Sequence, residues 1–561
     1  MLPTTVRALF DRAVAARDVL TTTGVARTIT PAGVATLARR FITRTLPKGP
    51  TAILSVHAAH KPDQEALVDL SPAGSPGAIS PERSPGASDT RLTFRQLDER
   101  IDRLARALLA LGVRKGDKIA VMMRNGHRYL LTQWAALRVG AAVVQIGYRL
   151  KAGEVAHILG NAEPVVMIHD ADLASVVGEA TAQAGRRPRT VTVPEGFDAL
   201  LAREPDQRLR PEGDGASAAV MVYTSGTTGR PKGAPRSLEK ALHDSVLDFI
   251  RQVGIRTDER HLVVAPLYHS AAPVFIALIY ALGGAVVMLE HFDPEQVLRA
   301  IDRERITSAF MVPTMLARLA ALPVEVRRRY DTSSIRWLMS GAAPLPTDTA
   351  RRIEEWMGPV LYNFYGSTET GLVTLALPGE HTARPGTVGR ALLGNEIRLL
   401  DDDGREVKPG EVGELFVRST MLVHGYHRDR EATSQAMREG FFSVGDLGRV
   451  DEAGYYYLAD RKHDMVISGG VNIYPWEIEQ HLHTHPEIAD VAVIGVPDPD
   501  WGESLKAFVV RSPGSAIDAA EVQRYCKSAL ADYKTPRSVV FVDALPRLPT
   551  GKVLKRELRK L

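Results

Sequence analysis

Residues 93–170 alternate between helix-like and strand-like segments, and no other feature of the sequence constrains the fold as strongly. Thr93 and Gln96 form a capping box at the start of an apolar stripe with helical period. The stripe consists of Leu97, Ile101, Leu104, Leu108 and Leu111, and Gly112 ends it. The segments KIAVMM, AAVVQI and PVVMIHD have strand character, and helix-like segments such as YLLTQWAALRVG separate them. Short connections between alternating helices and strands predict an α/β fold with helix-covered, mainly parallel sheets.

The pattern changes in the last third of the chain. After about residue 385, strands joined by Asp/Gly turns, as in EIRLLDDDGREVKPGEVGELFVR, predict a small β-rich subdomain. Past residue 460, the helix start YPWEIEQHL and the strands VAVIGV, KAFVV and SVVFV predict a compact α+β unit. We therefore expect a large N-terminal domain of several subdomains at 51–459, followed by a small C-terminal domain.

Length and charge exclude several classes of protein. A chain of 561 residues exceeds one ordinary core and predicts two or more domains. The net charge of +4 comes from 70 basic and 66 acidic residues, so the surface is mixed and gives little support for binding nucleic acid. The single cysteine, Cys526, excludes internal disulfides and cysteine-based metal clusters. We expect a cytoplasmic protein.

Two segments raise the question of membrane contact. The first 48 residues hold eight Lys or Arg against two Asp. They are expected to form a solvated helical extension at 1–50; the alternative is a basic arm that contacts anionic lipid at the inner membrane surface. Residues 270–289 form a run of twenty without a charge. Pro273 and the pair Gly283–Gly284 divide this run, which predicts a buried helix and a buried strand rather than a membrane span.

The stretch VYTSGTTGRPKGAP, residues 222–235, indicates a binding loop. Seven of the ten residues from Thr224 to Gly233 are Thr, Ser or Gly, so the loop exposes backbone N–H groups and hydroxyls. Such a loop can wrap a polyphosphate, with Lys232 as a point charge. The P-loop pattern fails, because Pro231 precedes Lys232 and Gly233 follows it. On its own the stretch is also compatible with an ordinary Gly/Ser-rich turn.

Five further motifs follow in a fixed order: SGAAPL at 340–345, NFYGSTET at 363–370, GFFSVGDLG at 440–448, DRKHDMVISGGVNIYPWEIE at 460–479 and PRLPTGKVLKREL at 546–558. With YTSGTTGRPKG, they resemble the adenylate-forming superfamily of acyl-CoA synthetases, luciferases and peptide-synthetase adenylation domains. The resemblance extends over about residues 52–561, and six ordered motifs exclude chance agreement.

The resemblance implies a set of ATP-binding residues. The loop residues that hold the β- and γ-phosphates are Thr224, Ser225, Gly226, Thr227, Thr228, Gly229 and Lys232. Thr368 binds phosphate, and Glu369 positions Mg²⁺, which prefers carboxylate and phosphate oxygens. The residues that enclose adenine are Gly341, Ala342, Ala343, Asn363, Tyr365 and Gly366, where Asn363 contacts the amino group and Tyr365 stacks. Asp446 accepts hydrogen bonds from the ribose hydroxyls, with the help of Arg461.

The resemblance also implies the catalytic residues. Lys552 is expected to stabilise the charge that shifts between carboxylate and phosphate, although by composition alone it is one more solvated lysine in a basic tail. His269 lines the acyl channel and positions the acid. Residues 460–463 form a hinge, with His463 where the family usually has Asp or Lys, so pH is expected to influence it. Rotation of the C-terminal domain, 464–561, brings Gly469 and Gly470 towards the tunnel for the thiol of coenzyme A.

The predicted function is an ATP-dependent fatty acyl-CoA ligase that acts through acyl-AMP and releases AMP and pyrophosphate. The small and apolar residues after His269 indicate a medium- to long-chain acyl pocket: Ser270, Ala271, Ala272, Val274, Phe275 and Ile276. A helix packed in the core explains them nearly as well. The alternatives are an acyl-AMP ligase that delivers to a carrier protein, a luciferase-like oxygenase and a non-catalytic nucleotide-binding regulator. The sequence is compatible with either a monomer or a homodimer.

One histidine cluster invites a different interpretation. His481, His483 and His485 lie in HLHTHP, and two of them are one helical turn apart. No array of carboxylates and histidines completes a metal site around them. We therefore expect an exposed helix end rather than a structural metal.

Overall fold

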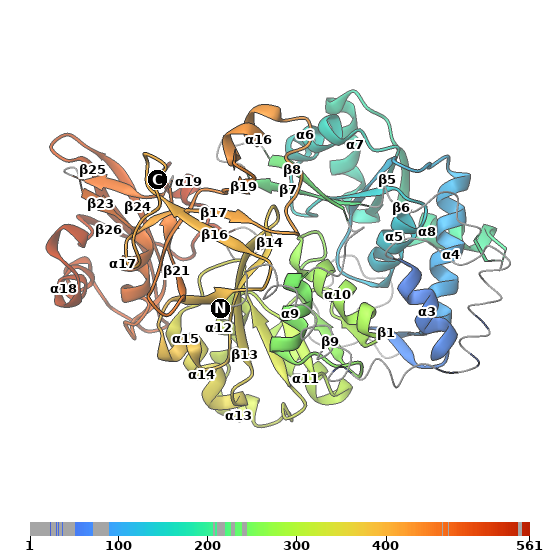
Figure 1. The fold of residues 1–561 in the computed structure, drawn as a ribbon, viewed down its shortest axis with the longest axis horizontal. Coiled ribbons are helices and arrows are strands. Elements are labelled where there is room, and N and C mark those ends of the chain that lie inside the picture. Colours follow the sequence, from blue (N-terminus) through green and yellow to red (C-terminus); the bar gives the residue numbers. More distant parts are fainter. Residues whose placement is uncertain are drawn as a thin grey trace, which may run out of the picture. The chain divides into compact units, whose positions relative to one another are not determined.

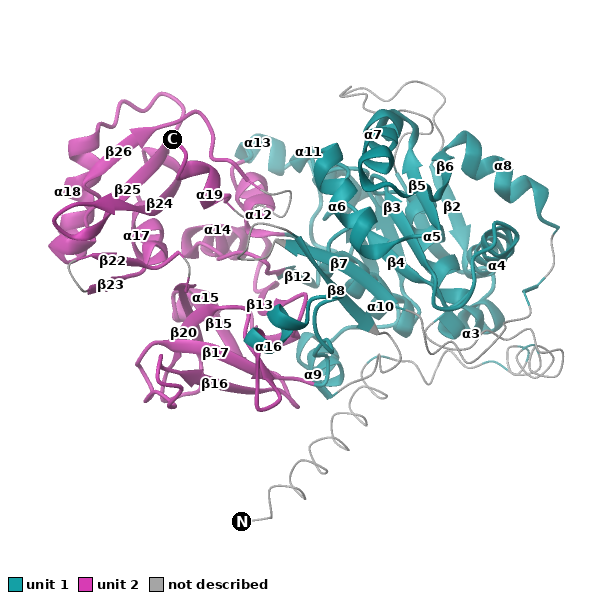
Figure 2. Cartoon of the chain, turned by 90° about the horizontal axis from the view of Figure 1, so that it is seen from above, with its two compact units in different colours: residues 1–311, 322–339, 420–435 teal, residues 312–321, 340–419, 436–561 magenta. Residues whose placement is uncertain are grey.

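The computed structural model describes residues 23, 30, 32, 36, 51–70, 89–205, 208–209, 219–225, 231–237, 244–462, 464–468, 471–547 and 553–561. The chain divides into two compact units (Figure 2). Unit 1 consists of residues 1–311, 322–339 and 420–435, and unit 2 of residues 312–321, 340–419 and 436–561. The expected N-terminal extension at 1–50 lies almost wholly outside the described residues.

The first sheet of unit 1 confirms the expected alternation of helices and strands. Its strands are β3 (Lys118–Met122), β4 (Ala142–Gln145), β5 (Val166–Asp170), β6 (Arg189–Val193), β7 (Ala219–Ser225) and β8 (Pro231–Ser237). They lie in the order β6-β5-β3-β4-β7-β8, and all pairs are parallel except β7 with β8. The helices α6 (Ala152–Ala162) and α7 (Ala174–Ala184) pack on one face, against Met122, Val144 and Ile146.

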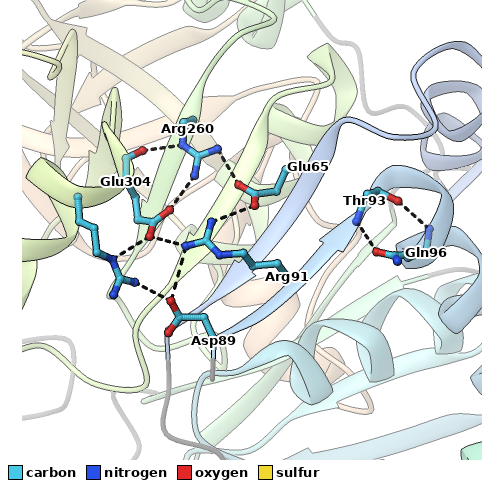
Figure 3. Close-up of polar contacts among 8 residues, drawn as sticks. Glu65, Asp89, Arg91, Thr93, Gln96, Arg260 and Glu304 are labelled. Atoms are coloured by element: carbon cyan, nitrogen blue, oxygen red, sulfur yellow. Dashed lines mark hydrogen bonds and ion pairs between the residues drawn. The ribbon is translucent and has the colours of Figure 1, made fainter. Parts of the chain in front are cut away.

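The predicted capping box is present at the start of α4 (Phe94–Ala110). The Thr93 hydroxyl accepts from the Gln96 N–H at 3.3 Å, and the Gln96 side chain accepts from the Thr93 N–H at 3.0 Å (Figure 3). Most of the predicted stripe is fully buried, at Leu97, Ile101, Leu104 and Leu108. The helix ends at Ala110, one turn residue before Gly112, whose φ of 88° favours glycine.

The second sheet of unit 1 carries the long uncharged run. Its strands are β2 (Thr90–Thr93), β1 (Glu65–Asp69), β10 (Ala285–Met288), β9 (Arg260–Val263), β11 (Ser308–Phe310) and β12 (Trp337–Ser340), in that order. The run forms α10 (Ala271–Leu282) and β10, with Gly283 between them at φ 83°, as predicted. No helix in the described part of the chain is long and apolar enough to cross a membrane.

A network of charged side chains links strands of this sheet to a helix (Figure 3). Arg91 on β2 donates to Glu65 at 3.0 Å and to Glu304 at 2.6 Å. Arg260 on β9 donates to the same two carboxylates, at 2.8 and 3.0 Å. Glu304 ends α11 (Pro294–Glu304) and is buried. The network therefore joins three strands and a helix. Each carboxylate receives charge-assisted hydrogen bonds from both arginines, and Arg303 Nε donates a third to Glu304 at 2.9 Å.

Unit 2 contains the expected β-rich subdomain. Its antiparallel strands are β13 (Leu361–Ser367), β14 (Gly371–Ala376), β15 (Thr387–Ala391), β16 (Glu396–Leu400), β17 (Gly413–Arg418), β18 (Met437–Arg438), β19 (Phe441–Phe442), β20 (Asp446–Val450) and β21 (Tyr456–Arg461). The helices α12 (Pro313–Ala320) and α14 (Thr347–Met357) also belong to unit 2. Strands β20 and β21 pair so that Asp446 lies opposite Arg461.

The α+β part at the end of the chain has its own sheet and core (Figure 1). Its strands are β22 (Val466–Ser468), β23 (Val471–Ile473), β24 (Ile488–Asp498), β25 (Gly502–Arg511) and β26 (Ser538–Phe541), and its helices are α17 (Pro475–Leu482), α18 (Ala519–Ala529) and α19 (Lys555–Leu558). Cys526 on α18 is fully buried in the core with Ile478, Val493 and Val522. Burial raises the pKa of its thiol to about 11.

The histidines of HLHTHP are packed rather than exposed, which corrects that expectation. The His481 ring stacks on Tyr525 at 4.5 Å, and the His485 ring meets the same tyrosine edge-on at 4.6 Å. Burial lowers the pKa of His483, so this ring is uncharged at neutral pH. Among the described residues, no group of His, Cys, Asp and Glu has the arrangement of a metal site.

Candidate active site

The predicted phosphate loop joins the two strands of a hairpin in unit 1. Strands β7 and β8 are paired up to the loop, with Thr224 opposite Lys232 and Ser225 opposite Pro231. Gly226, Thr227, Thr228 and Gly229 lie outside the described residues. The Lys232 ammonium lies 5.2 Å from the centre of the Tyr426 ring, a cation–π contact that the sequence did not indicate. The hairpin therefore fixes both ends of the loop and the backbone of Lys232.

The ribose residues of the prediction form a bonded group in unit 2. One oxygen of the Asp446 carboxylate accepts from the Tyr365 hydroxyl at 2.9 Å, and the other lies 3.1 Å from Arg461 Nε. Burial and the charge of Asp446 raise the pKa of Tyr365 well above its usual value, so Tyr365 is a neutral donor. Sequence reasoning assigned Tyr365 to adenine alone and missed this bond. The two contacts fix the orientation of the Asp446 carboxylate.

The predicted adenine residues include a buried amide, that of Asn363. Asn363 is 4 % exposed, and its Oδ1 has no hydrogen-bond partner within the described chain. A buried acceptor without a partner is costly, and an amino group such as that of adenine would satisfy it. The loop of Gly341, Ala342 and Ala343 runs close to this strand, since a Cβ on Gly341 would lie 2.6 Å from Phe364 Cε1. The position of the loop therefore requires glycine.

A tight turn between β13 and β14 presents Thr368 and Glu369. The Ser367 hydroxyl accepts from the Glu369 N–H at 3.1 Å and from the Thr370 N–H at 3.0 Å. Gly366 lies near the end of β13, just before the turn, and a Cβ there would lie 1.9 Å from the Gly371 carbonyl oxygen. Glu369 is buried, and its charge adds to the larger effect of Asp446, which raises the pKa of Arg461. The sequence pointed to Thr368 and Glu369 but missed the shaping role of Ser367.

His269 lies in unit 1 beside several buried polar groups. Its ring centre is 4.4 Å from that of Tyr268, and burial lowers the pKa of His269 to about 4. Nε2 of His269 and the hydroxyls of Tyr268 and Tyr129 have no hydrogen-bond partner among the described residues, and neither has the side-chain amide of Gln145. Gly147 contacts Tyr268, because a Cβ on Gly147 would lie 3.2 Å from its ring.

These polar groups belong to one region. Gln145 ends β4 two residues before Gly147. Burial raises the pKa of Tyr129, and the neighbouring Tyr268 raises it further. Tyr129 lies in the first turn of α5 (His127–Arg138). The sequence identified only His269 here.

Some predicted residues do not join a site. Phe275 is buried in a core of rings, 5.2 Å from Phe310 and 5.9 Å from His261, and Ile276 is also buried. They therefore support the helix core, not an acyl pocket. Lys552, Gly469, Gly470 and His463 lie outside the described residues.

Residues 54–427 match the AMP-binding enzyme family, and residues 477–552 match the AMP-binding enzyme C-terminal domain. The chain belongs to this family. It is 40 % identical over 474 residues to a feruloyl-CoA synthase of an Amycolatopsis species, covering 84 % of this chain and 94 % of the relative. A long-chain-fatty-acid–CoA ligase of Mycobacterium tuberculosis is 35 % identical over 488 residues, with the same coverage.

Among solved structures, the chain is similar to ATP-bound MatB from Rhodopseudomonas palustris. The TM-score is 0.78 at 30 % identity, with 91 % of this chain and 98 % of that chain covered. The family confirms the α/β fold with a large N-terminal and a smaller C-terminal domain. This AMP-binding enzyme is an acyl-CoA ligase that uses ATP and coenzyme A and acts through an acyl adenylate.

Proposed function

We propose that the acid substrate of this ligase is an aromatic acid with a hydroxyl on its ring, of the hydroxycinnamate type. The observation that carries the proposal is the set of buried polar groups near His269. The hydroxyls of Tyr129 and Tyr268 and the amide of Gln145 have no partner within the described residues. Each such buried group costs about 1–3 kcal/mol when it stays unbonded. A fatty acyl chain offers nothing to bond to them, whereas a phenol offers a donor and an acceptor.

The comparisons are consistent with an aromatic acid. The feruloyl-CoA synthase acts on an aromatic acid by its name, and it is 40 % identical to this chain. The core position of Phe275 also removes part of the support for a long apolar pocket. His269 is uncharged at neutral pH because its pKa is about 4, which suits a residue that positions the ionised acid.

The nucleotide residues are assigned to ATP on the contacts described above. Asp446, held by Tyr365 and Arg461, accepts from the ribose hydroxyls, and Asn363 accepts from the adenine amino group. The hairpin loop with Thr224 and Lys232 binds the β- and γ-phosphates. The carboxylate of Glu369 fits the oxygen ligands of Mg²⁺, which when bound neutralises phosphate charge.

Catalysis is assigned to Lys552, on its PTGK motif. The carboxylate of the acid attacks the α-phosphorus of ATP, and pyrophosphate leaves. Lys552 stabilises the charge that moves from carboxylate to phosphate in this step. The thiol of coenzyme A then attacks the acyl carbon, loses its proton, and AMP leaves. Residues 464–561 rotate about 460–463 between the two steps, and Gly469 and Gly470 then line the path of the thiol.

Mass-spectrometric product analysis tests the acid. Purified chain is given Mg-ATP and coenzyme A with ferulate, with cinnamate, which lacks the ring hydroxyl, or with octanoate or palmitate. A site that bonds a substrate hydroxyl strongly rejects the analogue without it. We expect ferulate to exceed cinnamate in kcat/KM by at least about 10-fold, and Tyr268→Phe to reduce that ratio. Equal kcat/KM for the two acids would contradict the proposal.

A fatty acid is the second candidate. It is supported by the 35 % identity to the long-chain-fatty-acid–CoA ligase and by Ala271 and Val274 on α10, which are only partly buried, unlike Phe275. Preferred turnover of palmitate or octanoate in the same experiment would establish it. The same reactions without coenzyme A test a further alternative, an acyl-AMP ligase. Such an enzyme accumulates acyl-AMP whether or not coenzyme A is present. Peripheral contact of the N-terminal arm with a membrane stays a proposal and is tested by sedimentation with anionic vesicles.

A further inference from the structure

A buried lysine near the end of the chain lies among acidic side chains that the mechanism does not use. Lys555 opens α19, three residues after Lys552. Its Nζ lies 2.9 Å from Glu479 Oε1, and only 12 % of the Lys555 side chain and 14 % of the Glu479 side chain are exposed. Burial lowers the pKa of Lys555, but the charges of Glu479, Asp460 and Asp464 outweigh it and raise the pKa overall. Lys555 is therefore a buried cation paired with acids.

The acidic partners come from separate elements. Glu479 belongs to α17, and its Oε1 also accepts from the Val493 N–H on β24 at 2.7 Å. Asp460 lies in β21, next to Arg461, and its carboxylate accepts from the Trp476 N–H at 3.1 Å. Lys555 thus connects α19 with α17, and its charge and that of Asp460 on β21 act on each other's pKa.

The other end of the same segment is also fixed. Both oxygens of the Asp490 carboxylate accept from Arg547 Nη2, at 2.7 and 2.6 Å. Arg547 pairs with Val553 as an antiparallel bridge, and the Leu554 N–H donates to the Pro546 carbonyl at 2.8 Å. Residues 548–552 lie outside the described part. The residues on either side of them, Arg547 and Val553, lie next to each other on the α+β core.

We infer that Lys555 is a positioning residue for adenylation, because it fixes the end of the segment that carries Lys552 to α17. The inference rests on the proposed role of Lys552. Lys555 acts through that residue, since its own charge is balanced by Glu479 and its neighbours and it is largely buried. A catalytic lysine misplaced by about 1 Å costs about 100-fold in rate. Thioester formation does not use Lys552, so the effect is confined to the first half-reaction.

The two half-reactions are measured separately on the full-length chain. Adenylation is followed by acid-dependent exchange of pyrophosphate into ATP, with whichever acid the parent activates. Thioester formation is followed with supplied acyl-AMP and coenzyme A. The variants are Lys555→Met, which keeps length and removes charge, and Lys555→Arg, which keeps the charge. Lys560→Met is the matched control, because this lysine of the same tail is exposed and its ion pair among the described residues is a local one, with Glu557.

Lys555→Met is expected to lower kcat for adenylation by about 10- to 100-fold, with KM for ATP and thioester formation changed less than about 3-fold. Lys555→Arg is expected to recover most of the rate, and Lys560→Met to leave both half-reactions unchanged. Equal losses in both half-reactions, or no loss in adenylation, would overturn the inference. If Lys555→Met does not fold, Glu479→Gln removes the same ion pair and must show the same split.

Lys552→Ala separates this inference from the proposed function. If that variant still adenylates at the parent rate, the role of Lys552 is wrong and the role of Lys555 fails with it. If Lys552→Ala loses adenylation while Lys555→Met and Glu479→Gln do not, only the positioning role of Lys555 is wrong.

Discussion

The contact between Tyr365 and Asp446 gives a quantitative test of the nucleotide site. Tyr365→Phe keeps the buried ring and removes only the hydroxyl that donates to Asp446 at 2.9 Å. A hydrogen bond to a charged group contributes about 1.5–3 kcal/mol, or roughly 10- to 150-fold in an equilibrium constant. Arg461 still holds the other carboxylate oxygen at 3.1 Å, so the loss is expected at the lower end.

Because the ribose does not react, Asp446 contributes equally to binding in the ground state and the transition state. We therefore expect Tyr365→Phe to raise KM for ATP about 10-fold, with kcat and KM for the acid within about 2-fold. Steady-state kinetics with varied ATP at saturating acid and coenzyme A measures this. Tyr362→Phe, on the same strand, is the matched control. An unchanged KM for ATP in Tyr365→Phe would refute the assignment of Asp446 to the ribose.

Three further changes have defined outcomes. Gly366→Ala brings a Cβ to 1.9 Å from a backbone oxygen, so the rate of pyrophosphate exchange should fall at least about 10-fold. Exchange at the parent rate would contradict the close approach of the backbone between β13 and β14. Arg138→Met removes the fully buried arginine paired with Asp98 and Asp102 and leaves them the partly exposed Arg208, so urea unfolding should show a loss of about 3 kcal/mol. Burial lowers the pKa of His57 to about 4 and of His261 to about 3. Between these pKa values and about pH 6.5, the unfolded chain therefore binds more protons at these histidines than the folded chain. As the pH is lowered from about 6.5 to 5, the free energy of unfolding should fall by about 1–2 kcal/mol for each histidine. A free energy of unfolding that stays constant over this range would contradict their burial.

Local features of the sequence predicted much of the fold. The capping box at Thr93, the proline that starts α17 and the glycines after α10 each act within a few residues, so they can be recognised without the structure. The motif order gave the family and hence the nucleotide residues. The same local logic left two interpretations of Phe275, because a run of apolar residues does not distinguish a pocket lining from a packed core.

Contacts between distant segments could not be predicted. Tyr129, Gln145 and Tyr268 are ordinary residues in the sequence, and only the fold shows that their polar atoms are buried without partners in the described chain. Lys555 is one basic residue of a basic tail in the sequence, and only the fold pairs it with Glu479, 76 positions earlier. The bond between Tyr365 and Asp446 likewise depends on the pairing of strands far apart in sequence.

The buried Cys526 makes the chain well suited to site-specific labelling. Its thiol is inaccessible in the α+β core, and with a pKa of about 11 only about one molecule in 10⁴ carries the reactive thiolate at neutral pH. Thiol reagents should therefore leave the parent protein unmodified. Cysteines introduced on the surface of residues 51–459 and 464–561 can then carry a pair of fluorophores while Cys526 stays in place. Energy transfer between them would follow the proposed domain rotation during turnover, on a protein that keeps its own core.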